Sequence, residues 1–150
     1  MSGGIWGLEN GYALMVGGSR DQLDAYLPGI VAGKPFQLSP PAATALALRH
    51  LSEPERARII ASMCPESGSV FAALLTGRVR VDPARVTAPV YVAAGGADRI
   101  VSRSVTGKVA RLYSATAHVY PRVGHWLLAG PHADELIQDI LDWIATAIDE

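Results

Sequence analysis

Two short apolar segments near the C-terminal end, with a helical stretch between them, constrain the fold more than any other feature. The run VTAPVYVAAGG at residues 86–96 is apolar and rich in β-branched side chains, without polar alternation. Such a run is typical of a parallel strand that is buried on both faces. A helix is expected over residues 104–113, a second strand at residues 117–121 (AHVYP), and a last helix from about Pro131. This order predicts a βαβ crossover with one more covering helix, and therefore an α/β fold.

The preceding part of the chain differs, because residues 1–82 carry helix signals and no convincing strand. Three helix starts are expected from serine caps: Ser39 before Pro40-Pro41, Ser52 with Glu55 as a capping box, and Ser67 or Ser69 before VFAALL. Gly77 is expected to end the third of these helices. An earlier helix over residues 20–31 is expected to be broken at Pro28-Gly29. The chain therefore divides near residue 82 into a helical region, 1–82, and an α/β region, 83–150.

Composition and charge narrow the choice of partner and compartment. The 150 residues are 49% hydrophobic, with 13 Lys and Arg against 14 Asp and Glu. The chain therefore has the length of one domain and no excess positive charge for nucleic acid. The single cysteine, Cys64, rules out an intrachain disulfide and a multi-thiolate zinc site and fits a reducing compartment. The sequence has no apolar run of about 18 residues and no secretion-signal pattern at its start, so we expect a cytoplasmic protein that does not bind a membrane.

The candidate chemistry lies where the two expected strands end. Asp98 follows the first strand in GGADRIV, and His125 follows the second in VGHW. Loops that leave the carboxyl ends of neighbouring parallel strands, about 4.8 Å apart, emerge at the same edge of the sheet, where α/β proteins bind ligands. The Asp98 carboxylate can then hold the His125 imidazole, fix its tautomer and stabilise its charged form, as a general base requires.

Each of these residues also has an ordinary structural interpretation. An aspartate after a Gly-Gly turn commonly serves as a turn residue or helix cap, and a single histidine before a tryptophan is commonly structural. Their position at the ends of successive parallel strands favours an acid–base pair. Trp126, next to His125, would either wall a substrate pocket or belong to the core. His50, His118 and His132 lack the spacing of metal ligands, so no metal is expected.

The stretch VTAPVYVAAGGADRIVS, followed by YSATAHVYPRVGHWLLAGPHADELIQDILDWI, resembles the C-terminal end of α/β-hydrolase-fold enzymes. In that family a strand of the form APVLVIAG precedes the acid of a catalytic triad, and a GHW or GH loop holds the triad histidine before the final helix. The resemblance covers residues 83–150 and implies that Asp98 is the triad acid and His125 the general base. Residues 1–82 resemble the helical cap or lid of such enzymes, and residues 64–75 (CPESGSVFAALL) resemble part of the cap in an esterase- or lipase-like branch.

The nucleophile is where the chain departs from this family. α/β-Hydrolases carry it on a G-x-S-x-G elbow, and the nearest segment here, Gly17-Gly18-Ser19-Arg20-Asp21, has Asp21 in place of the second glycine. Ser19 with Gln22 also fits a capping box at the start of the helix over residues 20–31. Ser19 is therefore either a helix cap or an unorthodox nucleophile.

The sheet is a second departure, because the chain offers its first strand only one parallel neighbour. Two strands leave long unpaired edges and do not normally form a stable sheet. The last helix also carries an apolar stripe that must face a sheet, formed by Leu136, Ile137, Ile140, Leu141, Trp143, Ile144 and Ile148. We therefore expect the C-terminal part of an α/β-hydrolase fold, its last two parallel strands with their helices, preceded by a helical cap. The missing strands would come from another polypeptide or from a second copy in a homodimer, or they would be lacking altogether.

The resemblance implies a serine hydrolase that acts on a small ester or related acyl substrate without a cofactor, and in which His125 deprotonates a serine absent from this chain. Dehalogenases, lyases and peroxidases of the same family share the acid–histidine pair, and the fold does not choose among them. The alternative is a non-catalytic remnant that serves as an interaction or packing module.

Overall fold

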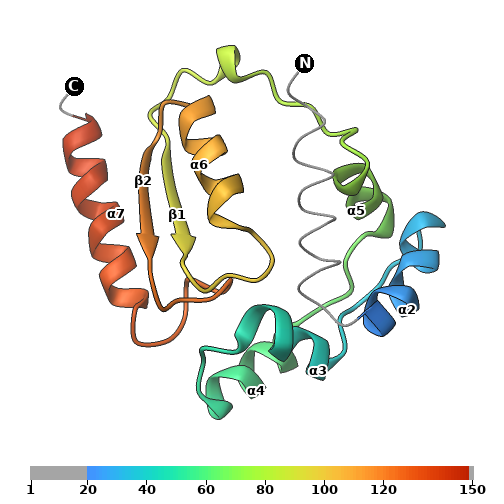
Figure 1. The fold of residues 1–150 in the computed structure, drawn as a ribbon. Helices are drawn as coiled ribbons and strands as arrows, with labels where there is room; N and C mark the ends of the chain where they lie inside the picture. The colour runs from blue at the N-terminus through green and yellow to red at the C-terminus, as the bar shows by residue number, and fades with distance from the viewer. Residues whose placement is uncertain (1–19, 149–150) are drawn as a thin grey trace.

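The computed structural model describes residues 20–148. Several helices precede a small parallel sheet, so the α/β class expected from the sequence is confirmed (Figure 1). The helical elements before the sheet are α2 (Arg20–Val31), α3 (Pro40–Ala43), the π-helical turn η1 (Thr44–Leu48), α4 (Glu53–Ser62), α5 (Gly68–Leu75) and the 3-10 turn η2 (Pro83–Arg85). The sheet region follows with β1 (Tyr91–Gly95), α6 (Arg103–Leu112), β2 (Thr116–Tyr120) and α7 (Ala133–Ile148).

Serine residues stand at the N-caps of α3, α4 and α5, and the side chains of Ser39 and Ser67 accept hydrogen bonds from backbone N–H groups that the first turn leaves free. The predicted starts are confirmed, with Ser39 before α3, Ser52 before α4 and Ser67 before α5. At α3 the Ser39 hydroxyl accepts a hydrogen bond from the Ala42 N–H at 3.4 Å. After α5, Gly77 has a φ of 64°, which glycine adopts without steric cost.

The prediction of a break at Pro28-Gly29 is wrong, because α2 is continuous from Arg20 to Val31. The turn after the proline is hydrogen-bonded, since the Ala32 N–H donates to the Pro28 carbonyl at 3.1 Å. Proline disfavours a helix interior, but tertiary packing can override that preference. Here the side chain of Ile30, in the turn after the proline, is buried.

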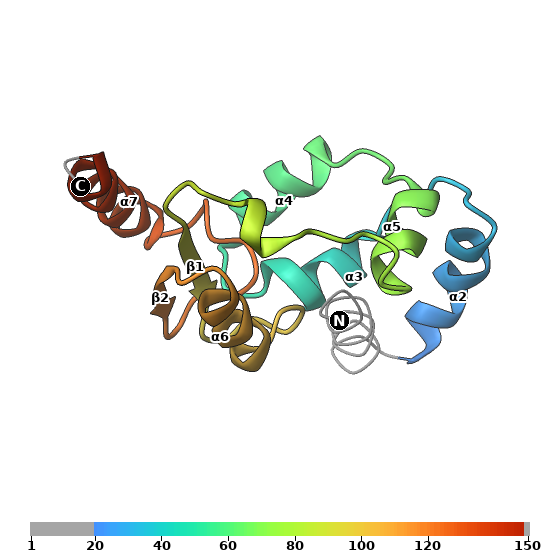
Figure 2. The same cartoon turned by 90° about the horizontal axis from the view of Figure 1, so that it is seen from above.

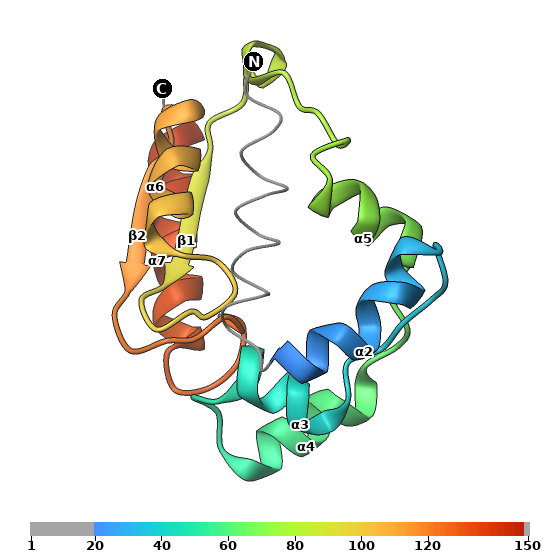
Figure 3. The ribbon, with the colours of Figure 1, turned by 45° about the vertical axis from the view of Figure 1, so that its right-hand side comes forward.

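β1 and β2 form the parallel pair that the sequence predicts, and the sheet described in residues 20–148 contains these two strands alone. The register runs from Tyr91 opposite Thr116 to Gly95 opposite Tyr120. Figure 2 and Figure 3 show α6 and α7 on opposite faces of the sheet. β1 covers Tyr91–Gly95 and is shorter than the expected 86–96. It pairs only with β2, and its hydrogen-bonded length therefore equals that of β2.

Two apolar clusters connect the elements. The first consists of Ala43, Ala47, Leu48, Leu51 and Ile59 from the helical part of the chain. Ile100 from the loop after β1 and Ala129 from the loop after β2 both pack against it. The second cluster joins Tyr120 and Val123 to Leu136 of α7. Because both loops contact the first cluster, α3, η1 and α4 lie beyond the carboxyl ends of the strands (Figure 1).

The apolar stripe of α7 faces the sheet only in part. Leu136 is buried in the second cluster, and the ring centroid of Trp143 lies 5.4 Å from that of Tyr91 on β1. Three other members of the stripe remain open to solvent, namely Ile137 (48% exposed), Leu141 (53%) and Ile144 (38%). Within residues 20–148 the stripe thus packs on the sheet only in part, because the two strands described there are too narrow to cover it.

Candidate active site

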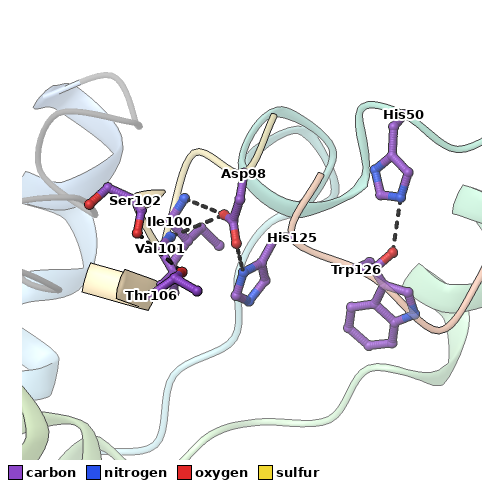
Figure 4. Close-up of polar contacts among 8 residues, drawn as sticks. All are labelled: His50, Asp98, Ile100, Val101, Ser102, Thr106, His125 and Trp126. Carbon is purple, nitrogen blue, oxygen red and sulfur yellow. Dashed lines mark hydrogen bonds and ion pairs between the residues drawn. The ribbon is translucent and has the colours of Figure 1, made fainter. Parts of the chain in front are cut away.

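Asp98 lies in the turn after β1 and is held there through one carboxylate oxygen. Its Oδ1 accepts hydrogen bonds from the backbone N–H of Ile100 at 2.7 Å and of Val101 at 3.0 Å (Figure 4). Asp98 is therefore a turn residue, as one of the two interpretations expects, through its Oδ1 atom. The other carboxylate oxygen, Oδ2, is left available for the neighbouring loop.

The loop that carries His125 packs directly against the end of β1. The Ala97 N–H donates to the Val123 carbonyl at 2.9 Å. A Cβ added to Gly95 would lie only 2.1 Å from the carbonyl oxygen of Gly124, so the loop can come this close only to a glycine. The loops after β1 and β2 are thus joined just before Asp98 and His125.

The predicted contact between Asp98 and His125 is confirmed as geometry. His125 Nδ1 lies 3.0 Å from Asp98 Oδ2, and the side chains are 36% and 7% exposed respectively (Figure 4). A carboxylate only accepts, so Nδ1 is the donor. Burial alone would raise the pKa of Asp98, but the hydrogen bonds from His125, Ile100 and Val101 outweigh it and hold that pKa below its ordinary 3.8. Asp98 is therefore ionised at neutral pH.

Two other histidine–carboxylate contacts are of a different kind. His132 Nδ1 lies 3.3 Å from Glu135 Oε2, one helical turn away on the surface. His118 Nδ1 lies 3.5 Å from Asp139 Oδ2, and the side chains of this pair are 46% and 32% exposed. Exposed polar contacts such as these contribute little energy and hold a side chain loosely. In the part of the chain that the structure describes, only His125 is paired with a buried carboxylate.

His125 keeps one ring nitrogen available for chemistry. Within residues 20–148 its only hydrogen bond is the one from Nδ1 to Asp98. An imidazole whose Nδ1–H is fixed in this way carries a lone pair on Nε2 and can accept a proton from a hydroxyl group. The candidate nucleophile Ser19 lies outside the described residues, and no serine hydroxyl within them is bonded to His125. The catalytic roles of Asp98 and His125 stay predictions.

Trp126 is exposed rather than part of the core, and its place in a substrate pocket stays a prediction. Its backbone is involved in a contact that the sequence did not indicate. The carbonyl oxygen of Trp126 lies 2.9 Å from Nε2 of His50 (Figure 4). His50 stands 76 positions earlier in the chain, so no local pattern could have linked the two residues.

The described residues contain no group of three or more His, Cys, Asp or Glu side chains placed to hold a metal ion. Within that same range, no helix has both the length and the apolar character to cross a membrane. The chain matches no protein-family model and no curated protein.

Proposed function

We propose that the chain is part of a serine hydrolase of the α/β-hydrolase type, which cleaves a small ester or related acyl substrate. The observation that carries the proposal is the buried Asp98 carboxylate 3.0 Å from His125 Nδ1, at the carboxyl ends of two parallel strands. In this role Asp98 orients the imidazole and stabilises its protonated form. His125 Nε2 takes the proton of the attacking serine and then gives it to the leaving alcohol.

In this proposal the serine comes from outside residues 20–148, either as Ser19 or from another polypeptide. The second source is supported by the edge of β1 that no strand within residues 20–148 covers, and by the exposed apolar residues of α7, which packs over β1. A strand added in parallel at that edge would end near His125, because the carboxyl ends of parallel strands share one rim. A second copy of the chain or a different protein would provide this strand.

A serine-reactive fluorophosphonate probe tests the proposal. The purified chain is incubated with the probe, alone and after addition of an extract of the cells that produce it, and labelled serines are identified by mass spectrometry. We expect labelling at Ser19 or on a polypeptide that copurifies with the chain. That labelling should fall by a factor of about 10² or more in His125→Gln and in Asp98→Asn.

The matched control is His118→Gln, because His118 also lies beside a carboxylate, that of Asp139, but at the surface. Labelling in this variant should equal that of the wild-type chain. Labelling that is absent, or that survives the loss of His125, contradicts the proposal. It would favour the non-catalytic interaction module, for which the exposed apolar side chains of α7 are the supporting observation.

A further inference from the structure

His50 reaches the loop of His125 from a distant part of the chain. It follows the π-helical turn η1, and its Nε2 lies 2.9 Å from the carbonyl oxygen of Trp126 (Figure 4). We propose that His50 is a positioning residue for His125. Lying on the helical side of the site, His50 holds the loop that carries the His125 imidazole. It acts through the loop backbone and not on the reacting atoms.

The hydrogen bond to Trp126 defines one tautomer of His50. A carbonyl oxygen only accepts, so Nε2 of His50 must carry a proton. Its other nitrogen, Nδ1, is buried and has no hydrogen-bond partner among the described residues. A proton on Nδ1 would therefore be buried without an acceptor, which is unfavourable. Because a bare Nδ1 would be buried without a donor as well, the tautomer is decided by Nε2, which must carry its proton to donate to the Trp126 carbonyl.

The same ring also closes over Gly124, the residue just before His125. A Cβ at Gly124 would lie 2.6 Å from His50 Nδ1 and 3.2 Å from its Cε1. The carbonyl oxygen of Gly124 lies in turn so close to β1 that a Cβ at Gly95 would be 2.1 Å from it. The residue before His125 is therefore packed against both β1 and His50, and the residue after it is hydrogen-bonded to His50.

The backbone on which His50 stands is itself well anchored. Leu48 and Leu51, on either side of it, are both buried in the first apolar cluster. Ala129, from the loop that follows His125, packs against the same cluster. A rigid support of this kind is what a residue needs in order to position another side chain accurately. The π-helical turn before His50 is of a type that often occurs at functional sites.

The inference rests on the proposed function, since positioning matters only if His125 acts as the base. Its test therefore measures the Asp98–His125 contact directly and uses no substrate. Failure of the probe labelling would contradict the hydrolase proposal and leave these spectra unchanged. Failure of the spectroscopic test would remove the role of His50 and leave the labelling unchanged.

The test is NMR spectroscopy of the full chain with 15N-labelled histidine. In the wild-type protein we expect His50 to be protonated on Nε2 and not on Nδ1, and the His125 Nδ1 proton to give a downfield signal protected by Asp98. In His50→Leu, which lacks the donor, that downfield signal should be lost through exchange with water. In His50→Gln, whose side-chain amide can still donate to Trp126, the signal should be retained.

His118→Gln is again the control, and it should leave the His125 signal unchanged. Far-UV circular dichroism verifies that each variant is folded. The inference is overturned if wild-type His50 carries its proton on Nδ1, or if the His125 signal persists in a folded His50→Leu chain. Should His50→Leu not fold, the tautomer of wild-type His50 decides the question, since only the Nε2–H form can donate to Trp126.

Discussion

Replacing Gly95 by alanine directly tests the loop packing that brings Asp98 and His125 together. A Cβ at this position would lie 2.1 Å from the carbonyl oxygen of Gly124 and 2.5 Å from that of Val123. Both are backbone atoms, so no side-chain rotation can relieve the clash. Cβ atoms essentially never come within 3.0 Å of a heavy atom of a residue that is not adjacent in the chain, and the loop must therefore move by about 1 Å.

The loss of stability expected for Gly95→Ala follows from the contacts that this movement of the loop disrupts. Overpacking of a tight contact costs about 1–3 kcal/mol. The displaced loop also loses the hydrogen bond from the Ala97 N–H to the Val123 carbonyl, now 2.9 Å long, and a bond of this kind contributes about 1 kcal/mol. We expect Gly95→Ala to lower the free energy of unfolding by about 2–4 kcal/mol. For a chain of this length the melting temperature should fall by about 5–15 °C.

Gly107→Ala is the matched control for this experiment. Gly107 lies inside α6, and the atom nearest to an added Cβ is Arg111 Nη1 at 3.5 Å, an ordinary contact. Alanine is favoured over glycine in a helix interior by about 0.5–1 kcal/mol, so this variant should melt slightly above the wild type. Thermal unfolding is followed by circular dichroism at one protein concentration, because association shifts the midpoint. If Gly95→Ala melts at or above the wild-type temperature, the close approach of the loop to β1 is refuted.

Three further predictions concern polar groups. The pKa of Asp98 is near 3.8 in the unfolded chain and lower in the folded chain. The free energy of unfolding should therefore decrease as the pH falls below 3.8 and through the folded pKa, and the urea midpoints of Asp98→Asn should lack this part of the decrease. Tyr120→Phe removes a hydroxyl that donates to Asp139 at 2.7 Å and should cost about 1 kcal/mol in urea unfolding, whereas no loss would contradict the bond. Ser102→Ala removes the cap of α6 and should cost about 1 kcal/mol, while Ser104→Ala in the same helix should cost nothing; equal effects would contradict the cap.

The features that could be predicted from the sequence are those decided over a short range or by topology. A serine cap such as Ser39 or Ser67 is decided within four residues, because the hydroxyl bonds to an N–H of the first turn. The contact between Asp98 and His125 spans 27 positions. It was still predictable, because parallel neighbouring strands bring their carboxyl ends to one edge of the sheet.

The features that could not be predicted depend on packing between distant segments. Nothing near Gly95 in the sequence shows that the carbonyl of Gly124 will lie against it. The contact of His50 with Trp126 likewise exists only because the first apolar cluster brings η1 to the loop after β2. Helix α2 passes through Pro28 for a related reason, since Ile30 in the next turn is buried. In each case tertiary packing decides what the local pattern leaves open.

The acid and the base of the candidate site are supported by different parts of the molecule. Asp98 is held by its own turn, through the N–H groups of Ile100 and Val101. The loop that carries His125 packs against β1 at Gly124, and in the proposal above it is also positioned by His50. A module that only packs against a partner has no need for an imidazole of fixed orientation, whereas a general base needs one. The fixed contact between the buried Asp98 carboxylate and His125 Nδ1 therefore favours the hydrolase proposal over the non-catalytic alternative.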